Sequence, residues 1–198
     1  MTGEQSPVDL EPAVDVRVVT GTARVGVLDA FLADLSAVGT DHGCTVQAFD
    51  ARLVAGPVHL RRAVALADRA FARGENVARE RAVGFLLYAA GRRQIDDALA
   101  MGVDEGETPV AVLVAADPDG SDPDGDDPDT GPDCGDPDPE AAASAVAALP
   151  AVDEGPVEFG DPDRIRSFFD IEGRELAATD ATLDEVVLER VALLDVEK

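Results

Sequence analysis

The chain has 198 residues with 16 basic and 41 acidic side chains, so its formal net charge is −25 when both histidines are neutral. This length is typical of one domain that can bury a real core. The negative charge excludes a protein that coats DNA non-specifically, because DNA repels a net anion unless the basic residues are gathered in one place. No run of 18 apolar residues occurs and the first residues hold no apolar signal segment, so we expect neither a membrane span nor a secretion signal.

The charged residues are strongly biased toward arginine and aspartate. Fifteen of the 16 basic residues are arginine, Lys198 is the single lysine, and aspartate outnumbers glutamate by 27 to 14. We interpret this as the composition of a halophile's cytoplasmic protein, whose carboxylates keep it soluble in high salt. An acidic mesophile protein with a disordered tail is the alternative. Cys44 and Cys134 lie far apart in unlike contexts, which indicates a reducing compartment.

The first half of the chain alternates strand and helix patterns. Residues 1–14 carry two prolines and no periodicity, which predicts a mobile tail. Hydrophobic periodicity then predicts a strand over 16–20, a helix over 27–38, a strand or bent pair of strands over 45–54, and a helix over 58–73 that follows Pro57. Asn76 is expected to cap a second helix that runs to Ala90, and Gly91 separates it from a third helix over 92–101.

The second half contains an apolar strand and an acidic insertion. Val110–Ala115 (VAVLVA) is apolar throughout, which predicts a strand in the middle of a sheet. Residues 117–140 hold eleven acids and no base, so they cannot bury enough apolar area to offset their ordering entropy, and we expect a disordered loop. Its spacing of Asp122, Asp124 and Asp126 is reminiscent of a calcium loop. Asp127 stands where that loop needs glycine, however, which disfavours specific calcium binding.

After the loop, the pattern predicts a helix over 140–149, a strand over 156–159 and a helix over 163–169. Thr182 and Glu185 have capping-box spacing and open a last helix that extends to residue 196. Apolar residues cover more than one face of this helix, so we expect surplus surface for a partner, at Val186, Leu193 and Leu194. Together the elements predict a single α+β domain over 15–198, with helices packed on a short, mostly antiparallel sheet.

Residues able to support catalysis are scarce. His42 and His59 are the only histidines, too few for a three-histidine metal site, and no Gly-x-Ser-x-Gly or phosphate-loop motif is present. We therefore predict a protein that is not an enzyme, with no cofactor and no metal. A histidine in a first helical turn, as His59 is, more often caps or packs than acts as a base.

The basic residues are concentrated in one window. Residues 52–93 hold nine arginines against three acids, a charge of +6, while the rest of the chain carries −31. Arg62, Arg69 and Arg73 have a spacing that keeps them on one helix face. One interpretation is a surface for an anionic partner. The other is that these arginines form salt bridges with remaining segments, including the acidic loop. In high salt counterion release contributes little, which favours unpaired RNA ends over DNA as the anionic partner.

The turn at Gly91 also has two interpretations. Backbone N–H groups at the start of a following helix, beside Arg92, Arg93 and Gln94, are suited to bind an anion. Equally, Gly91 is typical of a helix C-cap followed by a solvated first turn.

This turn carries a family resemblance. Gly91-x-Arg93-Gln94-Ile95 follows the apolar helix FLLYAA, Leu53-Val54-Ala55 precedes a helix with His59 and Ala63, and the VAVLVA strand and the closing LDEVVLERVALL helix follow. Over residues 16–198 this arrangement resembles the small, non-catalytic tRNA-binding subunit of the KEOPS complex, the PRP-kinase-binding protein family, in a halophilic archaeal form. Tyr88 departs from the family, where a more polar residue is expected.

The resemblance implies a role in an assembly that installs threonylcarbamoyl on the adenosine beside the anticodon of certain tRNAs. This subunit would hold tRNA by its 3′ CCA end, bind and activate the kinase-like ATPase subunit, and contact the threonylcarbamoyl-transferase subunit only indirectly. The implied tRNA contacts are Gly91, Arg93, Gln94 and Ile95; charge and proximity in sequence add Arg92, Arg61, Arg62, Arg69 and His59. The alternatives are a regulatory domain that binds a phosphorylated small molecule at the Gly91 turn, and a purely structural interaction module.

Overall fold

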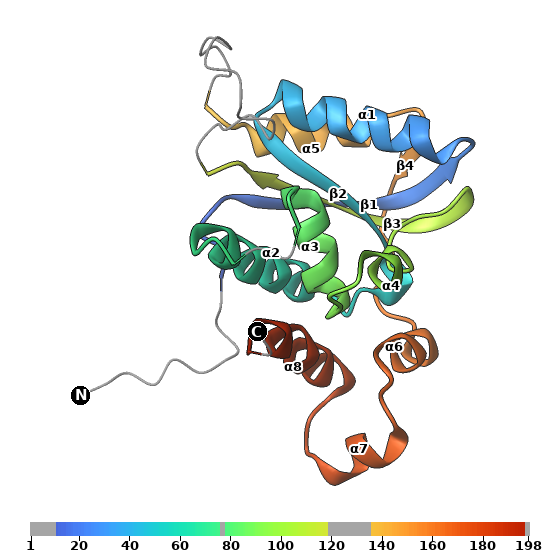
Figure 1. The fold of residues 1–198 in the computed structure, drawn as a ribbon. Coiled ribbons are helices and arrows are strands. Elements are labelled where there is room, and N and C mark those ends of the chain that lie inside the picture. The colour runs from blue at the N-terminus through green and yellow to red at the C-terminus, as the bar shows by residue number, and fades with distance from the viewer. Residues whose placement is uncertain (1–10, 76–77, 119–135, 197–198) are drawn as a thin grey trace.

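The computed structural model describes residues 11–75, 78–118 and 136–196. Its strands form one antiparallel sheet in the order β2-β3-β1-β4. These strands are β1 (Val16–Val25), β2 (Cys44–Asp50), β3 (Gly106–Ala116) and β4 (Val152–Glu154). Helices α1 (Leu28–Asp41) and α5 (Pro139–Ala147) cover one face, and α2 (Pro57–Ala72) and α3 (Arg81–Ala90) cover the other (Figure 1). The predicted α+β class with an antiparallel sheet is confirmed.

Strand β3 lies between β2 and β1, as its apolar run predicted. Its side chains alternate between two cores. Val110, Val112 and Val114 face the core beneath α1 and α5, while the intervening residues up to Ala115 face the core beneath α2 and α3. Because helices cover both faces, no position in the middle of this strand needs to be polar.

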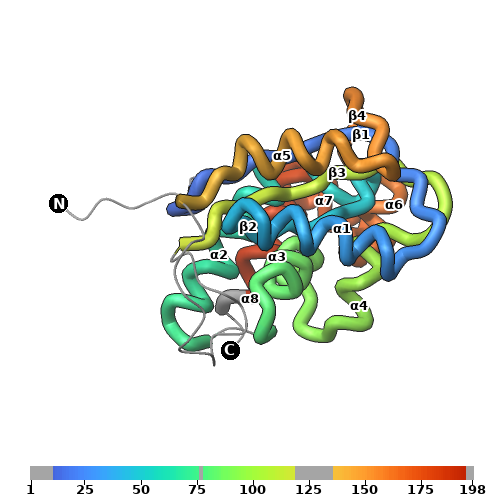
Figure 2. Tube along the Cα trace, turned by 90° about the horizontal axis from the view of Figure 1, so that it is seen from above, coloured from blue at the N-terminus to red at the C-terminus, as the bar shows by residue number. Residues whose placement is uncertain are grey.

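Helices α1 and α5 share one hydrophobic core on their face of the sheet. Phe31, Leu35 and Val38 of α1 pack with Ala142 and Val146 of α5 in the same core. The view from above shows these two helices side by side over the strands (Figure 2). Helix α5 begins at the Asp138 N-cap, whose side chain accepts a hydrogen bond from the Ala141 N–H.

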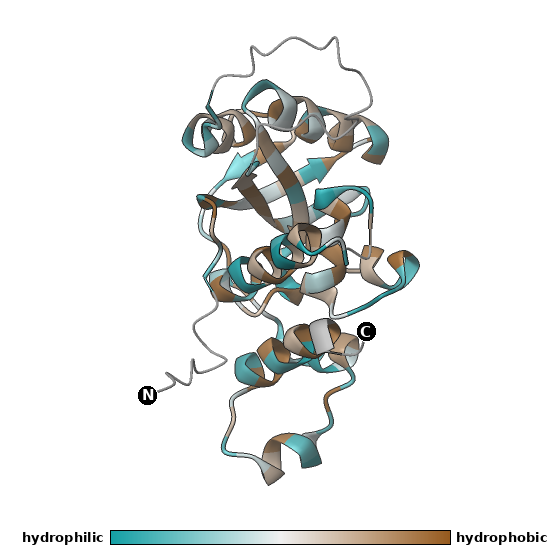
Figure 3. Ribbon diagram, turned by 60° about the vertical axis from the view of Figure 1, so that its left-hand side comes forward, coloured by the Kyte–Doolittle hydropathy of each residue, from teal (hydrophilic) through white to brown (hydrophobic). Residues whose placement is uncertain are grey.

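On the opposite face, α2 and α3 pack closely against each other. A Cβ atom at Gly84 would lie 2.8 Å from the Phe71 ring, so a glycine at this position lets the two helices approach. Helices α6 (Pro162–Phe169) and α8 (Leu183–Val196) lie beyond α2 and α3, away from the sheet (Figure 1). Hydrophobic residues run through the strands and across these packed helices (Figure 3).

The expectation that the last helix offers Val186 and Leu194 to a partner is wrong. Both side chains are buried, at 2% and 6% exposure, in the core that α8 shares with α2, α3 and α6. Only Leu193 of the three predicted residues is exposed, at 46%. The surplus of apolar positions on α8 exists because this helix packs on several elements at once.

Several element boundaries differ from the prediction. The third helix is only α4 (Ile95–Leu99), and a short α7 (Gly173–Ala178) was not expected. The predicted strand at 156–159 is replaced by β4, which pairs with Gly21–Ala23 of β1. A Cβ atom at Gly21 would lie 2.4 Å from the Asp153 carbonyl oxygen, so glycine at this strand position permits the pairing.

The predicted tail and acidic loop lie partly outside the described residues. This holds for residues 1–10 of the tail, for the Asn76 helix cap, and for residues 119–135, including Asp122, Asp124, Asp126, Asp127 and Cys134. Val14, within the predicted tail, packs against the core. The Asp117 N–H donates to the Gly43 oxygen and the Asp138 N–H donates to the His42 oxygen. Both ends of the acidic insertion therefore meet the same turn between α1 and β2.

Candidate functional site

The turn after α3 is closed by backbone hydrogen bonds. Gly91 adopts a left-handed conformation, with φ 60° and ψ 31°. The Gly91 N–H donates to the Tyr88 oxygen and the Arg92 N–H donates to the Leu87 oxygen, both at 3.1 Å. This is the Schellman arrangement of a helix C-cap. The two amides are thus already bonded, which supports the helix-cap interpretation of Gly91 over a backbone anion site.

The residues that follow this cap lie on the surface. Arg93, Gln94 and Ile95 are all exposed, and Ile95 retains 47% of its accessible surface. Helix α4 has only five residues and carries Asp96 and Asp97 in its first turn, which disfavours an anion at its N-terminus. The turn therefore presents a guanidinium, an amide and an aliphatic side chain in consecutive positions.

Two observations place this turn against α6 and α8. Arg92 donates from Nη2 to the Phe168 carbonyl oxygen of α6 at 2.5 Å, and its guanidinium lies 5.7 Å from the Phe168 ring centroid. A Cβ atom on Gly91 would lie 3.4 Å from the Arg190 carbonyl oxygen of α8. Arg92 thus anchors the turn through its side chain, and its guanidinium is engaged by the protein rather than displayed.

His59 is a structural residue. It is 1% exposed, its Nδ1 accepts from the Ala55 N–H at 3.2 Å, and its Nε2 lies 2.8 Å from the Ala89 oxygen. Because Nδ1 accepts, the proton is on Nε2, which donates to Ala89. Burial lowers the pKa of His59 to about 4. This neutral imidazole joins the start of α2 to the end of α3, and its burial corrects the expectation that it contacts RNA directly.

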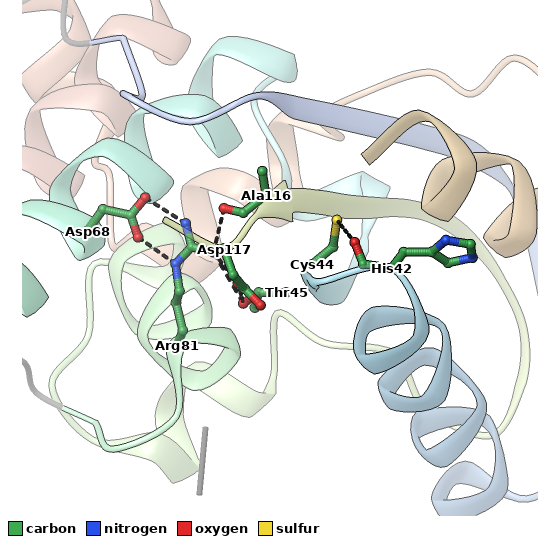
Figure 4. A network of polar contacts seen from close by, with 7 residues as sticks. All are labelled: His42, Cys44, Thr45, Asp68, Arg81, Ala116 and Asp117. Atoms are coloured by element: carbon green, nitrogen blue, oxygen red, sulfur yellow. Dashed lines mark hydrogen bonds and ion pairs between the residues drawn. The ribbon is translucent and has the colours of Figure 1, made fainter. Parts of the chain in front are cut away.

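Two arginines of the basic window are bound by carboxylates. Arg52 donates to the buried Asp50 carboxylate, with Nη2 to Oδ2 at 2.7 Å. Arg81 binds Asp68 through two nitrogens, at 2.7 and 2.8 Å, and Asp117 at 2.6 Å (Figure 4). Asp117 is the first residue of the predicted acidic loop. For these two arginines the salt-bridge interpretation is confirmed.

The other arginines of the window differ in burial. Arg61, Arg73, Arg79 and Arg93 are exposed, Arg69 is half-buried, and Arg62 is buried. Arg62, Arg69 and Arg73, which their spacing placed on one helix face, are therefore buried, half-buried and exposed in that order. The prediction of direct RNA contact therefore fits the exposed Arg61 and Arg93 better than Arg62.

Two depressions are lined by residues other than those of the Gly91 turn. One, of about 420 Å³, is lined by Arg52 and by acidic residues of the segment before and within α6. The other, of about 260 Å³, is lined by Val58 and His59 at the start of α2 and by Asp184 and Leu188 of α8. Within 11–75, 78–118 and 136–196 no three His, Cys, Asp or Glu side chains are grouped to hold a metal ion.

Comparisons with known proteins leave the family open. The sequence matches no protein-family model, and a search of curated proteins finds no relative. Among the helices of the described residues, none combines the length and the apolar character needed to cross a membrane.

Chemically, the exposed turn is suited to binding. Arginine contacts phosphate and stacks on bases, glutamine reads base edges through its amide, and an aliphatic side chain packs on a base. The cap and the Arg92 anchor hold the backbone from which these three side chains project.

Proposed function

We propose that this protein is a non-catalytic tRNA-binding adaptor, the counterpart of the small regulatory subunit of the KEOPS tRNA threonylcarbamoyladenosine-modification complex. It recruits tRNA through the single-stranded 3′ CCA end and binds and activates the kinase-like ATPase subunit. The observation that carries the proposal is the capped and anchored turn at 91–95, in which three consecutive side chains, Arg93, Gln94 and Ile95, are exposed.

The turn favours single-stranded RNA over a phosphorylated small molecule. A small phosphate ligand needs free backbone amides or an enclosed pocket, and the Gly91 and Arg92 amides are already bonded within the protein. A flexible RNA end instead brings its bases to exposed side chains. The RNA phosphates can lie near Asp96 and Asp97, because molar salt screens the repulsion between charges that are more than about 3 Å apart.

Arg93→Glu is expected to weaken tRNA binding by roughly tenfold to a hundredfold, because it removes a guanidinium contact and adds a repelled carboxylate. The fold should persist, since exposed substitutions usually change stability by about 0.5 kcal/mol or less. Fluorescence anisotropy with labelled tRNA in molar KCl measures the effect. Arg174→Glu, the same change at an exposed position of α7, should bind as wild type does.

Removing the terminal CCA should reduce the affinity of wild type and leave that of Arg93→Glu nearly unchanged, because both changes act on the same contact. The proposal is wrong if Arg93→Glu binds as wild type and the CCA end makes no difference.

The partner contact is expected on the exposed part of α8. Leu193→Glu should separate the protein from the kinase-like ATPase subunit while leaving tRNA affinity unchanged, because a charge at an exposed apolar contact must be desolvated on docking. Co-elution of the pair in size-exclusion chromatography is the measurement. Leu32→Glu is the matched control, because Leu32 is an exposed leucine of α1, which lies on the other face of the sheet. Retention of the pair by Leu193→Glu would place the contact elsewhere.

A further inference from the structure

An open depression lies between the start of α2 and helix α8. Its volume is about 260 Å³, and it is lined by residues 55–59 together with Asp184 and Leu188 of α8. Val58 retains 55% of its accessible surface, and a Cβ atom on Gly56 would meet no other atom within 4 Å. Pockets that hold drug-sized ligands begin at about 300 Å³, so this one is suited to a single side chain.

Asp184 supplies the only charged group of this lining. The His59 ring also borders the depression, but both of its nitrogens are already bonded, Nδ1 to the Ala55 N–H and Nε2 to the Ala89 oxygen. Burial lowers the pKa of His59 to about 4, so the imidazole is neutral near pH 7 and brings no positive charge. The remaining lining side chains are aliphatic.

The Asp184 carboxylate is not engaged by the described parts of the chain. It is exposed in the first turn of α8, and no hydrogen bond or ion pair joins it to any residue of 11–75, 78–118 or 136–196. Its neighbour Glu185 differs, because that carboxylate accepts hydrogen bonds from Thr182 in the capping box. The oxygens of Asp184 are therefore available to a ligand.

A long basic side chain matches both parts of this surface. Its aliphatic stem can pack on Pro57, Val58 and Leu188 while its charged group reaches the Asp184 carboxylate, as amphipathic side chains do where apolar surface borders water. Arginine fits better than lysine, because its guanidinium is more weakly hydrated and binds a carboxylate through two parallel hydrogen bonds.

The number of charged groups favours a protein over a free small molecule as the source of this arginine. Free arginine and agmatine each carry a second charged group, and the lining offers no counterpart for it. An arginine within a protein needs only the one carboxylate, because its backbone stays outside the depression. The net charge of −25 disfavours a second copy of this chain and favours a basic partner.

We propose that this depression is a docking site for an arginine side chain of a different protein, with its stem against Pro57, Val58 and Leu188 and its guanidinium on the Asp184 carboxylate. Leu193, the expected contact of the kinase-like ATPase subunit, follows Leu188 by five residues, which places it about 140° further around α8. The arginine site therefore uses another face of the same helix, and it does not rest on the proposed function.

The probe for the site is N-acetyl-arginine methylamide, an arginine whose backbone carries no charge. It is titrated into the full chain in molar KCl, and the methyl signals of Val58 and Leu188 are followed by NMR. The citrulline analogue has nearly the same shape without the charge, and the leucine analogue has only an apolar side chain. Wild type should show saturable shifts with the arginine probe and an affinity for the citrulline probe that is about threefold to tenfold lower.

Asp184→Asn should lower the affinity for the arginine probe by the same factor and abolish the preference over citrulline. Asp34→Asn, the same change at an exposed position of α1 on the other face of the sheet, should bind as wild type does. The proposal is overturned if the arginine probe gives no saturable shifts or if Asp184→Asn keeps the preference. It is also overturned if the leucine probe binds as tightly as the arginine probe, which would assign the depression to an apolar side chain.

Sedimentation of wild type at increasing protein concentration tests a second copy of this chain as the source of the arginine. Wild type should show no self-association that depends on Asp184. Self-association that Asp184→Asn abolishes and Asp34→Asn preserves would place an arginine of a second copy in the depression, and would overturn its assignment to a different protein.

Discussion

Arg81→Met is expected to lower the free energy of unfolding by about 3–5 kcal/mol, which is the usual cost of removing one partner from a buried ion-pair network. Arg81 is the first residue of α3, and its side chain is only 13% exposed. The loss should be measured by denaturant unfolding, as a shift of the midpoint with the slope unchanged.

The size of this effect follows from what Arg81 connects. Its guanidinium donates to Asp68 on α2, to Asp117 and the Ala116 carbonyl oxygen at the end of β3, and to the Thr45 hydroxyl on β2 (Figure 4). It also lies 4.8 Å from the Phe85 ring centroid. Without it, two half-buried carboxylates lie close together with no cation between them, and α3 loses this polar contact with the sheet.

Two further variants separate charge from geometry. Arg81→Lys keeps the charge but cannot reproduce the two-nitrogen contact with Asp68, so we expect an intermediate loss. Adding Asp68→Asn to Arg81→Met should recover part of the stability, because it removes one of the uncompensated carboxylates. A loss below about 1 kcal/mol for Arg81→Met would mean that the network contributes no more than a surface ion pair does.

Local patterns predicted the central parts of this fold. The apolar VAVLVA run is a central strand, and Thr182 and Glu185 form the predicted capping box, with the Thr182 N–H donating to the Glu185 carboxylate at 2.7 Å. Both depend on residues close in the sequence. Strand β4 depends on Gly21, more than a hundred residues earlier, so its position could not be found from its own three residues.

The charge pattern of residues 52–93 could not show which of its arginines are paired or buried in the folded protein. Arg81 and Asp117 lie 36 residues apart, and only the folded sheet brings them together. Helix periodicity correctly placed Arg62 and Arg69 on one face of α2. It could not show that Arg62 itself is buried in the folded protein, at 7% exposure.

The candidate site was predicted in part. Gly91 does end a helix, and residues 93–95 are exposed, as a solvated turn requires. The sequence did not reveal that Arg92 turns back to the Phe168 carbonyl oxygen, because α6 lies more than 70 residues downstream. An arginine near a helix end has the same local sequence pattern whether its side chain bonds to the protein itself or is exposed to a ligand.

His59 predicts a distinctive dependence of stability on pH. Its pKa is about 4 in the folded protein, against an ordinary value of 6.5 that applies to the unfolded chain. Below pH 6.5 the unfolded chain therefore binds a proton that the folded protein excludes. The contribution of neutral His59 is complete above pH 6.5 and declines as the pH falls to about 4, by on the order of 3 kcal/mol in all.

His59→Gln isolates this contribution from the protonation of the many carboxylates, which is common to both proteins. A glutamine amide can still donate to the Ala89 oxygen but does not titrate, and it loses the ring packing against Phe169. The variant should therefore be less stable than wild type at pH 7.5, and the gap should narrow steadily toward pH 4.5 in urea unfolding. If the difference in the free energy of unfolding between the two proteins stays constant over this range, His59 has the same pKa in the folded and unfolded chains. The expected pH dependence arises only because the folded protein excludes the proton that the unfolded chain binds.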